Sequence, residues 1–421
     1  MSLTLLHPYS VFIYEMITYP VIFFSAIFYF IAIRDLVQRK KITVSEEVDV
    51  KSKKLPFVTI QIPTLNEIVA VRCAKRCLEL DYPKDKYEII IGDDSNDKKI
   101  SRRIDKFIHK YSQVKVSRRG NNKGFKAGNL NYMLKQSKGE IIVIFDSDFV
   151  PHKDFLKKIV KPFEDTNVAC VQTKWGYINK NQNRVSKLAT SVLMVYHHIL
   201  APINERLGIS LLFGSGEAVR RSALEELGGW QEGSLTEDVE FSVRVLKKGY
   251  KIKYLHSFET PGEVPFTVKG FAKQQRRWAY GNTKAFIDHS KDILFGKIFT
   301  IKQKLYLMFT LLGYLISPFI AIFFISGTLT WFTGTPGPID WGKFLFVFGK
   351  MLLLTSGYLF SVYVALRREG GGRYIFNVFF SSLTIGIFVT FYVCLGVLKA
   401  FIGKGMAWTI IPKQGNRGVK I

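Results

Sequence analysis

Two carboxylates lie one residue apart at the end of a strongly apolar run. Asp146 and Asp148 flank Ser147 and follow the apolar residues 141–145. Like charges this close raise each other's pKa unless a cation lies between them. A hard divalent ion, Mg²⁺ or Mn²⁺, binds carboxylate oxygens and can bridge to a diphosphate. The triplet therefore fits a metal and diphosphate site, and a solvated turn at a strand end is the alternative.

A second acidic pair and a lysine could also bind parts of a nucleotide. Asp93 and Asp94 come after the apolar residues 87–92. Carboxylates there can accept hydrogen bonds from a nucleobase or a ribose hydroxyl, although Asp-Ser-Asn-Asp is also typical of a turn. Lys126 lies where a helix is predicted to begin, and a cation there suits a diphosphate. A lone surface lysine is the plainer interpretation.

Three residues open another predicted helix and carry two carboxylates. Thr236, Glu237 and Asp238 begin the helical pattern of residues 238–248. The structural interpretation is an N-cap with acidic first-turn residues, which the helix dipole favours. The functional interpretation is that one carboxylate projects into a cleft as a general base.

A basic stretch also contains residues able to bind a sugar or a phosphate. Residues 269–304 hold nine Lys or Arg and two Asp, and they include Gln274, Arg277 and Trp278. An arginine beside a tryptophan suits a leaving phosphate and a sugar face. The alternative is that this stretch only faces lipid headgroups, to which basic and aromatic residues are well suited.

Further candidates have two interpretations each. Trp175 and Trp230 are either core residues or platforms on which a sugar stacks. Gly214 and Gly216 allow a backbone to approach a ligand closely, or only form a turn.

The elements that must position these groups alternate between strand and helix. Strands are predicted over residues 57–62, 87–92, 114–117 and 139–148, and helices over residues 67–80, 101–112 and 124–136. This alternation predicts an α/β fold with a mainly parallel, doubly wound sheet. Ligands of such sheets bind beyond the carboxyl ends of the strands, which is where the acidic clusters fall.

The composition indicates that only part of the chain lies in water. The 421 residues are 48% hydrophobic and include 35 Phe, yet 60 Lys or Arg stand against 34 Asp or Glu, for a net charge of +26. Such a chain separates lipid-embedded from soluble parts. Its aromatic content excludes disorder, and its four cysteines exclude a disulfide scaffold. Cys73 and Cys77 are expected to be buried thiols in a reducing compartment, and Cys394 to face the membrane.

Apolar segments long enough to span a bilayer divide the chain. A span needs ~20 apolar residues, and the candidates are residues 11–33, 305–332, 344–366 and 374–398. We expect an anchor and linker over residues 1–54 and a soluble domain over 55–268. Interface helices over 269–304, membrane helices over 305–398 and a basic tail over 399–421 complete the prediction.

Basic residues predict the orientation of these segments. Arg34, Arg39, Lys40 and Lys41 follow the first span, so the positive-inside rule places the soluble domain in the cytosol of a plasma membrane or its equivalent. Three further spans would leave the tail outside, although its basic residues favour the inside. Either one candidate is interfacial or re-entrant, or the rule fails here. The tail carries five basic residues, Lys399, Lys404, Lys413, Arg417 and Lys420.

Nucleic-acid binding is a weaker explanation of the charge. Much of it adjoins membrane segments, and no helix-turn-helix, zinc-finger or RNP signature is present. We expect an anionic substrate and a membrane surface instead, and no nucleic acid.

The motifs, taken in order, resemble a known family. DD at 93–94, KAGN at 126–129, DSD at 146–148, TED at 236–238 and QQRRW at 274–278 are similar to the inverting family 2 glycosyltransferases of the cellulose synthase and mannan synthase type. VQTKWGYIN at 171–179 and GGWQ at 228–231 strengthen the likeness. The resemblance implies a GT-A nucleotide-binding domain beside transmembrane helices.

The resemblance also implies roles on the donor side of the site. Asp93, with Glu67 and Asp94, would hold the nucleobase and ribose of a nucleotide-sugar donor. Lys126 would contact the diphosphate, and Asp146 would bind the donor.

On the metal and acceptor side, Asp146 and Asp148 would bind Mg²⁺ or Mn²⁺. Asp238 would deprotonate the acceptor hydroxyl. The leaving diphosphate and the acceptor would be bound by Gln274, Arg277, Trp278 and Glu237.

One motif departs from the family pattern. Processive members gate the site with an aromatic-x-Val-Thr-Pro-Lys loop, and residues 408–413 keep the aromatic, the Pro and the Lys but have Ile411 in place of Thr. The tail is thus expected to be a remnant of that loop. The resemblance implies synthesis of a β-linked polysaccharide from UDP-glucose or GDP-mannose, with single addition to a lipid acceptor as the alternative. A transporter or receptor that binds nucleotides without chemistry is a third hypothesis.

Overall fold

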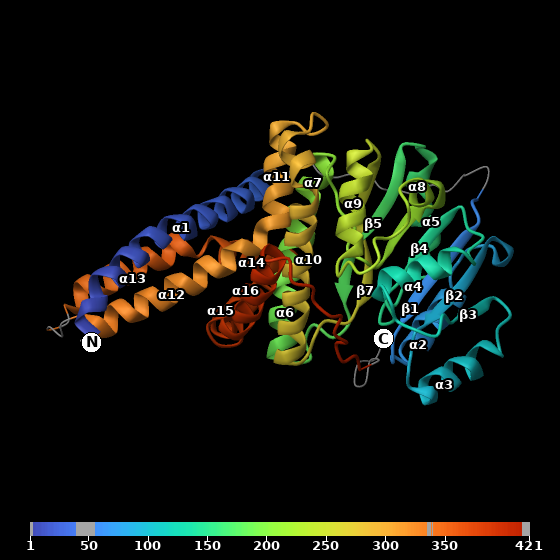
Figure 1. Ribbon diagram of the computed structural model, residues 1–421, viewed down its shortest axis with the longest axis horizontal. Helices are drawn as coiled ribbons and strands as arrows, with labels where there is room; N and C mark the ends of the chain where they lie inside the picture. Colours follow the sequence, from blue (N-terminus) through green and yellow to red (C-terminus); the bar gives the residue numbers. More distant parts are fainter. Residues whose placement is uncertain (1–2, 39–54, 335–337, 339, 415–421) are drawn as a thin grey trace.

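The structure is a computed structural model that describes residues 3–38, 55–334, 338 and 340–414 (Figure 1). Arg39, Lys40, Lys41, Arg417 and Lys420 lie outside the described residues, so the orientation argument from them stays a prediction. A sheet domain occupies one side of the molecule, and apolar helices extend from the other (Figure 1).

A seven-stranded sheet forms the centre of the soluble domain, in the order β3-β2-β1-β4-β6-β5-β7. Its strands are β1 Val58–Thr64, β2 Tyr87–Asp93, β3 Val114–Ser117, β4 Ile141–Ile144, β5 Val168–Tyr177, β6 Glu217–Arg220 and β7 Lys251–Gly262. Strand β6 runs antiparallel to both β4 and β5, and the other pairs are parallel. The predicted α/β fold is confirmed, and β5, β6 and β7 add to the strands predicted.

Helices cover both faces of the sheet because successive strand side chains point in opposite directions. Ile89 and Ile91 pack with one layer and Ile90 with the other. The first layer contains α2 Ala70–Leu78, α3 Lys98–Ile108 and α5 Phe155–Val160. The second contains α4 Phe125–Leu134, α8 Arg221–Glu226 and α9 Glu237–Lys247.

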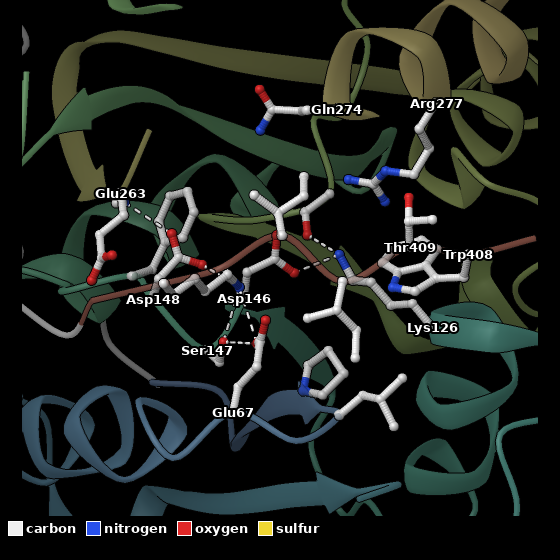
Figure 2. A pocket seen from close by; sticks show the side chains of 18 of the residues that line it. Glu67, Lys126, Asp146, Ser147, Asp148, Glu263, Gln274, Arg277, Trp408 and Thr409 are labelled. Carbon is white, nitrogen blue, oxygen red and sulfur yellow. Dashed lines mark hydrogen bonds and ion pairs between the residues drawn. The ribbon is translucent and has the colours of Figure 1, made fainter. Parts of the chain in front are cut away.

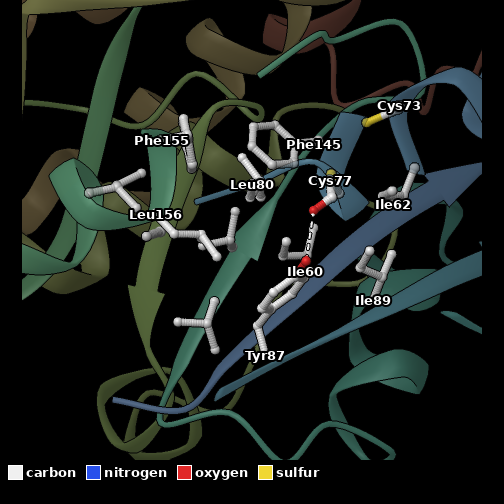
Figure 3. Close-up of a cluster of buried hydrophobic side chains, with 14 of the residues drawn as sticks. Ile60, Ile62, Cys73, Cys77, Leu80, Tyr87, Ile89, Phe145, Phe155 and Leu156 are labelled. Atoms are coloured by element: carbon white, nitrogen blue, oxygen red, sulfur yellow. Dashed lines mark hydrogen bonds between the residues drawn. The ribbon is translucent and has the colours of Figure 1, made fainter. Parts of the chain in front are cut away.

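The first core includes two of the cysteines. Cys73 and Cys77 are fully buried against the sheet near Ile60 and Ile89 (Figure 3). Burial raises the pKa of the Cys77 thiol well above its usual value. The two residues are thus buried free thiols, as predicted.

Long helices lie between the sheet domain and the apolar helices. They are α6 Arg184–Val195, α7 Ala201–Arg206 and α10 Val268–Phe295. Thr267 caps α10, since its hydroxyl accepts from the backbone N–H of Gly270 at 3.1 Å. The predicted interface segment, residues 269–304, contains most of α10 and the first residues of the helix that starts at Ile301.

The apolar part consists of helices that form a separate core. They are α1 His7–Gln38, α11 Ile301–Leu312, α12 Ile316–Thr333, α13 Trp341–Thr355, α14 Gly357–Arg368, α15 Ile375–Ser381 and α16 Ile387–Phe401. Short 3₁₀ or π turns complete the chain at Leu3–Leu6, Lys84–Lys86, Lys161–Glu164, Tyr196–Leu200, Gly313–Leu315, Gly372–Tyr374 and Ser382–Gly386.

In the part of the chain that the structure describes, three helices are long and apolar enough to cross a membrane: His7–Val37, Ile301–Thr333 and Gly372–Phe401. The predicted span at 344–366 is instead a pair, α13 and α14, bent by 61° at Ser356. The end of this pair returns to the helices beside the sheet domain, because the Arg368 guanidinium contacts both the Asp35 carboxylate and the backbone oxygen of His198, between α6 and α7.

Both ends of the segment Gly372–Phe401 lie beside the sheet domain. Just before it, Glu369 contacts Lys180 at 3.1 Å and His198 at 3.0 Å. After it, the ammonium of Lys413 reaches Asp148 at 2.6 Å. Between these points α16 packs along α10 over many residues. The segment thus starts and finishes on the same side of the molecule.

Candidate active site

A cleft opens at the carboxyl ends of β1 and β4, and α10 and the C-terminal segment form its other walls (Figure 2). It encloses about 1360 Å³ including its opening to solvent. All but one of the residues to which the resemblance assigned a role line it. The lining residues among them are Glu67, Asp94, Lys126, Asp146, Asp148, Glu237, Asp238, Gln274, Arg277 and Trp278.

The remaining residue, Asp93, is buried behind the cleft wall. Its carboxylate accepts from Nε of Arg118 at 2.8 Å and from the backbone N–H of Ser95 at 3.1 Å. Its neighbour Asp94 lines the cleft and pairs with the Arg119 guanidinium, with the closest contact at 2.6 Å. Asp94 therefore belongs to the cleft wall, while Asp93 lies outside the lining and holds the turn.

Lysines neutralise the Asp-Ser-Asp triplet. The ammonium of Lys126 contacts Asp146 at 2.8 Å and Glu237 at 3.2 Å, and it donates to the backbone oxygen of Gly214 at 2.5 Å. Burial lowers the pKa of Lys126, but the charges of Asp146, Glu237 and Glu217 outweigh burial and raise the pKa above its usual value. Lys126 is therefore a fixed cation in the cleft.

The second lysine comes from the C-terminal segment. Lys413 contacts Asp148 at 2.6 Å, Glu67 at 3.1 Å and the hydroxyl of Ser147 at 3.0 Å. Ser147 in turn donates to the Glu67 carboxylate (Figure 2). An acidic pocket that was expected to bind a metal thus accommodates a positive charge.

The residues present fit a metal bound jointly with a ligand. Among the described residues, no group of three or more His, Cys, Asp or Glu side chains is arranged to hold a metal ion. Asp146 and Asp148 supply hard carboxylate oxygens from one turn. Mg²⁺ is commonly held by one or two carboxylates together with substrate phosphates and water. The donor set therefore fits an ion whose remaining ligands come from a diphosphate.

Asp238 has the properties of a general base. It lies in the first turn of α9 and is only 9% exposed. Burial, and next the charge of Glu237, raise its pKa to about 7, against the opposing charges of Lys126 and Arg277. A carboxylate with this pKa accepts a proton far more readily near neutral pH than an ordinary aspartate does.

A glycine brings a turn of the chain against this base. Gly214 has a φ of +84°, and a Cβ there would lie 3.0 Å from Oδ2 of Asp238 and 3.2 Å from Nζ of Lys126. The backbone N–H of Gly214 donates to the buried carboxylate of Glu217 at 2.8 Å. The turn at Gly214 therefore lies against the candidate base, and close approach of its backbone to a ligand stays a prediction.

One face of α10 contributes polar side chains with unused hydrogen-bonding atoms. Gln274, Arg277 and Trp278 all line the cleft. Among the described residues, Oε1 of Gln274 and Nε of Arg277 are buried without a hydrogen-bond partner. The Arg277 guanidinium stacks 4.1 Å from the ring centroid of Trp408. Since buried polar atoms are normally paired, these two are free to bind a ligand.

An aromatic wall faces the base. Trp175 lies 6.4 Å from Trp278 and 6.0 Å from Phe213, between ring centroids, and all three line the cleft. Aromatic faces suit the apolar faces of a sugar ring. Trp230, in contrast, is 2% exposed and packs on Phe241 in the core. Of the two tryptophans with open interpretations, only Trp175 can reach a ligand.

Sequence reasoning missed two features of the site. Glu217 was not a candidate, because a lone glutamate in a strand gives no signal of burial. Burial raises its pKa well above the usual value, with a further contribution from Asp238. Lys413 was noticed only within the loop-like motif, and Ile411 packs near Gly270 at the start of α10.

Known proteins resemble the chain in sequence and fold. Residues 141–409 match the Glycosyl transferase family group 2. Glucomannan 4-beta-mannosyltransferase 1 of Oryza sativa subsp. japonica is 26% identical over 390 residues, which cover 88% of this chain and 72% of that protein. Probable glucomannan 4-beta-mannosyltransferase 7 of the same organism is 30% identical over 283 residues, which cover 63% and 48%.

A solved structure shares the fold. The mannosyltransferase from Pyrobaculum calidifontis in complex with GDP-Man and Mn²⁺ superposes with a TM-score of 0.64 at 19% identity. The superposition covers 93% of this chain and 99% of that one. The α/β domain and the apolar helices therefore form a known arrangement of the GT-A type.

Proposed function

Because this chain belongs to glycosyl transferase family group 2 and is a glycosyltransferase, we propose that it elongates a β-linked polysaccharide by inverting transfer of mannose from GDP-mannose. The observation that carries the proposal is the position of Asp238. It is a base with a pKa of about 7, in one cleft with the Asp146–Lys126 pair and the unpartnered Arg277. The choice of mannose is supported by the names of both rice relatives and by the ligand of the archaeal enzyme.

The transfer is a single displacement at the anomeric carbon. Asp238 takes the proton of the acceptor hydroxyl while the oxygen forms a bond to the anomeric carbon. The bond from that carbon to the diphosphate breaks, and the diphosphate leaves with the electron pair. Lys126 and Arg277 stabilise the negative charge that develops on it. Attack opposite to the leaving group inverts an α-linked donor into a β-linked product.

We assign the donor and the acceptor to different walls of the cleft. Asp94 and Glu67 are assigned to the ribose and nucleobase, and Asp93 supports them from behind. Gln274 and Trp278, with Glu237 nearby, are assigned to the acceptor and the leaving diphosphate. The aromatic faces of Trp175 and Trp278 are well placed to stack on the acceptor sugar.

Asp146 and Asp148 are assigned to a divalent cation, Mn²⁺ or Mg²⁺. When bound, it neutralises charge on the donor diphosphate. Lys413 contacts the same acidic pocket, so this lysine must give way to the ion or share the carboxylates with it.

The membrane arrangement proposed is a cytosolic sheet domain at a plasma membrane or its equivalent. Helix α1, the segment Ile301–Thr333 and the bent pair α13–α14 would cross the bilayer. The segment Gly372–Phe401 would lie along its inner face, because Glu369 before it and Lys413 after it contact the sheet domain. This arrangement puts Lys399, Lys404 and Lys413 inside, and it removes the conflict with the positive-inside rule.

A donor and product screen tests the proposal. Purified protein in lipid receives GDP-mannose, GDP-glucose or UDP-glucose with Mn²⁺, and the products are sized after chain-end labelling. Polymer from GDP-mannose is the expected result. A product with one sugar on a lipid would show that the acceptor is a lipid and that no polysaccharide is made. Turnover of UDP-glucose alone would refute the choice of donor.

A further inference from the structure

A second cavity lies between the interface helix α6 and helix α15, and it shares no lining residue with the catalytic cleft. It offers about 110 Å³ of space to water-sized molecules. Its polar lining consists of Arg184 and Lys187 from α6, and Asn377 and Ser381 from α15. Leu188 and Val378 form the apolar part of the wall. No acidic side chain belongs to the described lining.

The polar side chains of this cavity lack ion-pair and hydrogen-bond partners among the described residues. Within the described part of the chain, neither Arg184 nor Lys187 forms an ion pair, and the side chains of Asn377 and Ser381 form no hydrogen bond. Ser381 is only 6% exposed. Nearby Lys180, in contrast, is paired with Glu369 at 3.1 Å. Two cations, an amide and a hydroxyl around an unfilled space form a typical oxyanion site.

The surroundings of the cavity identify the source of such an anion. Phe376 and Phe380 precede Asn377 and Ser381 on α15 and are 73% and 64% exposed. They lie in an apolar segment whose exposed face is suited to acyl chains. Lys187 also stacks 5.1 Å from the ring centroid of Tyr374, an aromatic typical of the headgroup level. Basic pockets between helices at the inner membrane face bind lipid headgroups.

We propose that this cavity binds the phosphate of an anionic lipid headgroup, with the acyl chains along Phe376 and Phe380. The lipid would join α6 to α15 at the membrane surface. Helix α6 also carries Leu193, which lines the catalytic cleft. The site thereby couples the membrane to a wall of the catalytic cleft.

Lipid retention by the full-length protein tests the proposal. Phosphatidylglycerol is titrated into protein in phosphatidylcholine-containing micelles, and bound lipid is counted by native mass spectrometry. The variant R184Q/K187Q should retain phosphatidylglycerol roughly 30-fold more weakly than the wild type, from the usual contribution of two juxtamembrane cations. The matched control K98Q/K99Q, which removes two exposed lysines at the start of α3 in the sheet domain, should retain it like the wild type.

A second variant and a second ligand sharpen the outcome. Asn377→Leu adds an apolar residue to an apolar helix, so it should keep the thermal unfolding temperature and still weaken retention. Inorganic phosphate is tested in lipid-free detergent. The proposed site would be overturned if R184Q/K187Q retained phosphatidylglycerol as well as the wild type. It would also be overturned if the control lost as much phosphatidylglycerol as R184Q/K187Q does. If inorganic phosphate bound as tightly as phosphatidylglycerol, the occupant of the cavity would be a free phosphate and not a lipid.

Discussion

At the residue scale, the proposed base Asp238 must be deprotonated for the site to act. Its pKa is about 7 because it is buried and lies beside Glu237. The base works only when deprotonated, so kcat/KM should fall about tenfold per pH unit below a pH of about 7 and level off above it. Initial rates from about pH 5 to pH 9 check this. A flat profile, or one that rises toward acid, would contradict the role of Asp238.

The glycine beside this base gives a second prediction. Gly214→Ala should lower kcat strongly, because the new Cβ would lie 3.0 Å from Asp238 and 3.2 Å from Lys126. The matched control is Gly228→Ala, since Gly228 has nearly the same φ, +83°, but no atom within 4 Å of such a Cβ. Both variants have a similar backbone strain, so both should unfold at similar temperatures. Equal activity in the two would show that the space around Asp238 has no effect on catalysis.

The residues of the site were predictable to the extent that they follow apolar strands. Asp94, Asp146 and Asp148 come directly after such runs, and parallel strands bring their carboxyl ends to one edge. Lys413 could not be placed by this reasoning, because its contact with Asp148 depends on how the chain after α16 folds back onto the cleft. Whether Asp93 or Asp94 faces the cleft also depends on arginine partners that the pattern does not reveal.

At the element scale, the strands β1 to β3 and helices α2, α3, α4 and α9 agree with the predicted ranges to within a few residues. The strand β5 shows why others were missed. Its residues Gln172 and Thr173 are polar yet fully buried. The Gln172 amide donates to the backbone oxygen of Ser215 at 2.9 Å, and its side-chain oxygen accepts from the N–H of Phe213 at 2.8 Å. Satisfied polar groups can be buried, so hydropathy alone cannot find such a strand.

A buried ion pair joins the first apolar helix to the last turn of α14. The side chains of Asp35 and Arg368 are 7% and 5% exposed and contact each other. Asp35→Asn should lower the free energy of unfolding by about 3 to 5 kcal/mol, because it leaves a buried guanidinium without its counter-charge. Thermal unfolding in detergent measures the effect.

The control for this variant is an exposed pair. Glu79→Gln removes the partner of Arg76, where the side chains are 48% and 34% exposed. Its cost should stay below about 1 kcal/mol. If Asp35→Asn were no more destabilising than Glu79→Gln, the pair would not hold α1 against α14.

At the scale of the whole molecule, the chain path predicts a membrane topology. Gly370 and Lys404 flank the segment Gly372–Phe401 and lie on the side of the sheet domain, whereas Pro338 lies between α12 and α13. In sealed inside-out vesicles, Gly370→Cys and Lys404→Cys should react with an impermeant maleimide, and Pro338→Cys should not. Cys73, Cys77 and Cys170 are buried and give little background. Reaction at only one of the two flanking positions would show that the segment crosses the bilayer.

The sequence alone could not decide this point, because length and apolarity are the same for a span and for a helix buried at an interface. The packing of α16 along α10 supports the interfacial position that we propose. In this arrangement the basic α10 and the C-terminal segment lie at the membrane surface, and the cleft opens beside them.

The most direct test of the site as an inverting transferase is the anomeric configuration of its product. Wild-type protein and Asp238→Asn receive GDP-mannose, Mn²⁺ and a mannan acceptor, with Asp288→Asn, an exposed change on α10, as control. NMR of the product should show a new β-mannosyl linkage from the wild type and the control. Asp238→Asn should turn over about 10² to 10⁴ times more slowly while still binding GDP-mannose. An α-linked product, or unimpaired transfer by Asp238→Asn, would contradict the account.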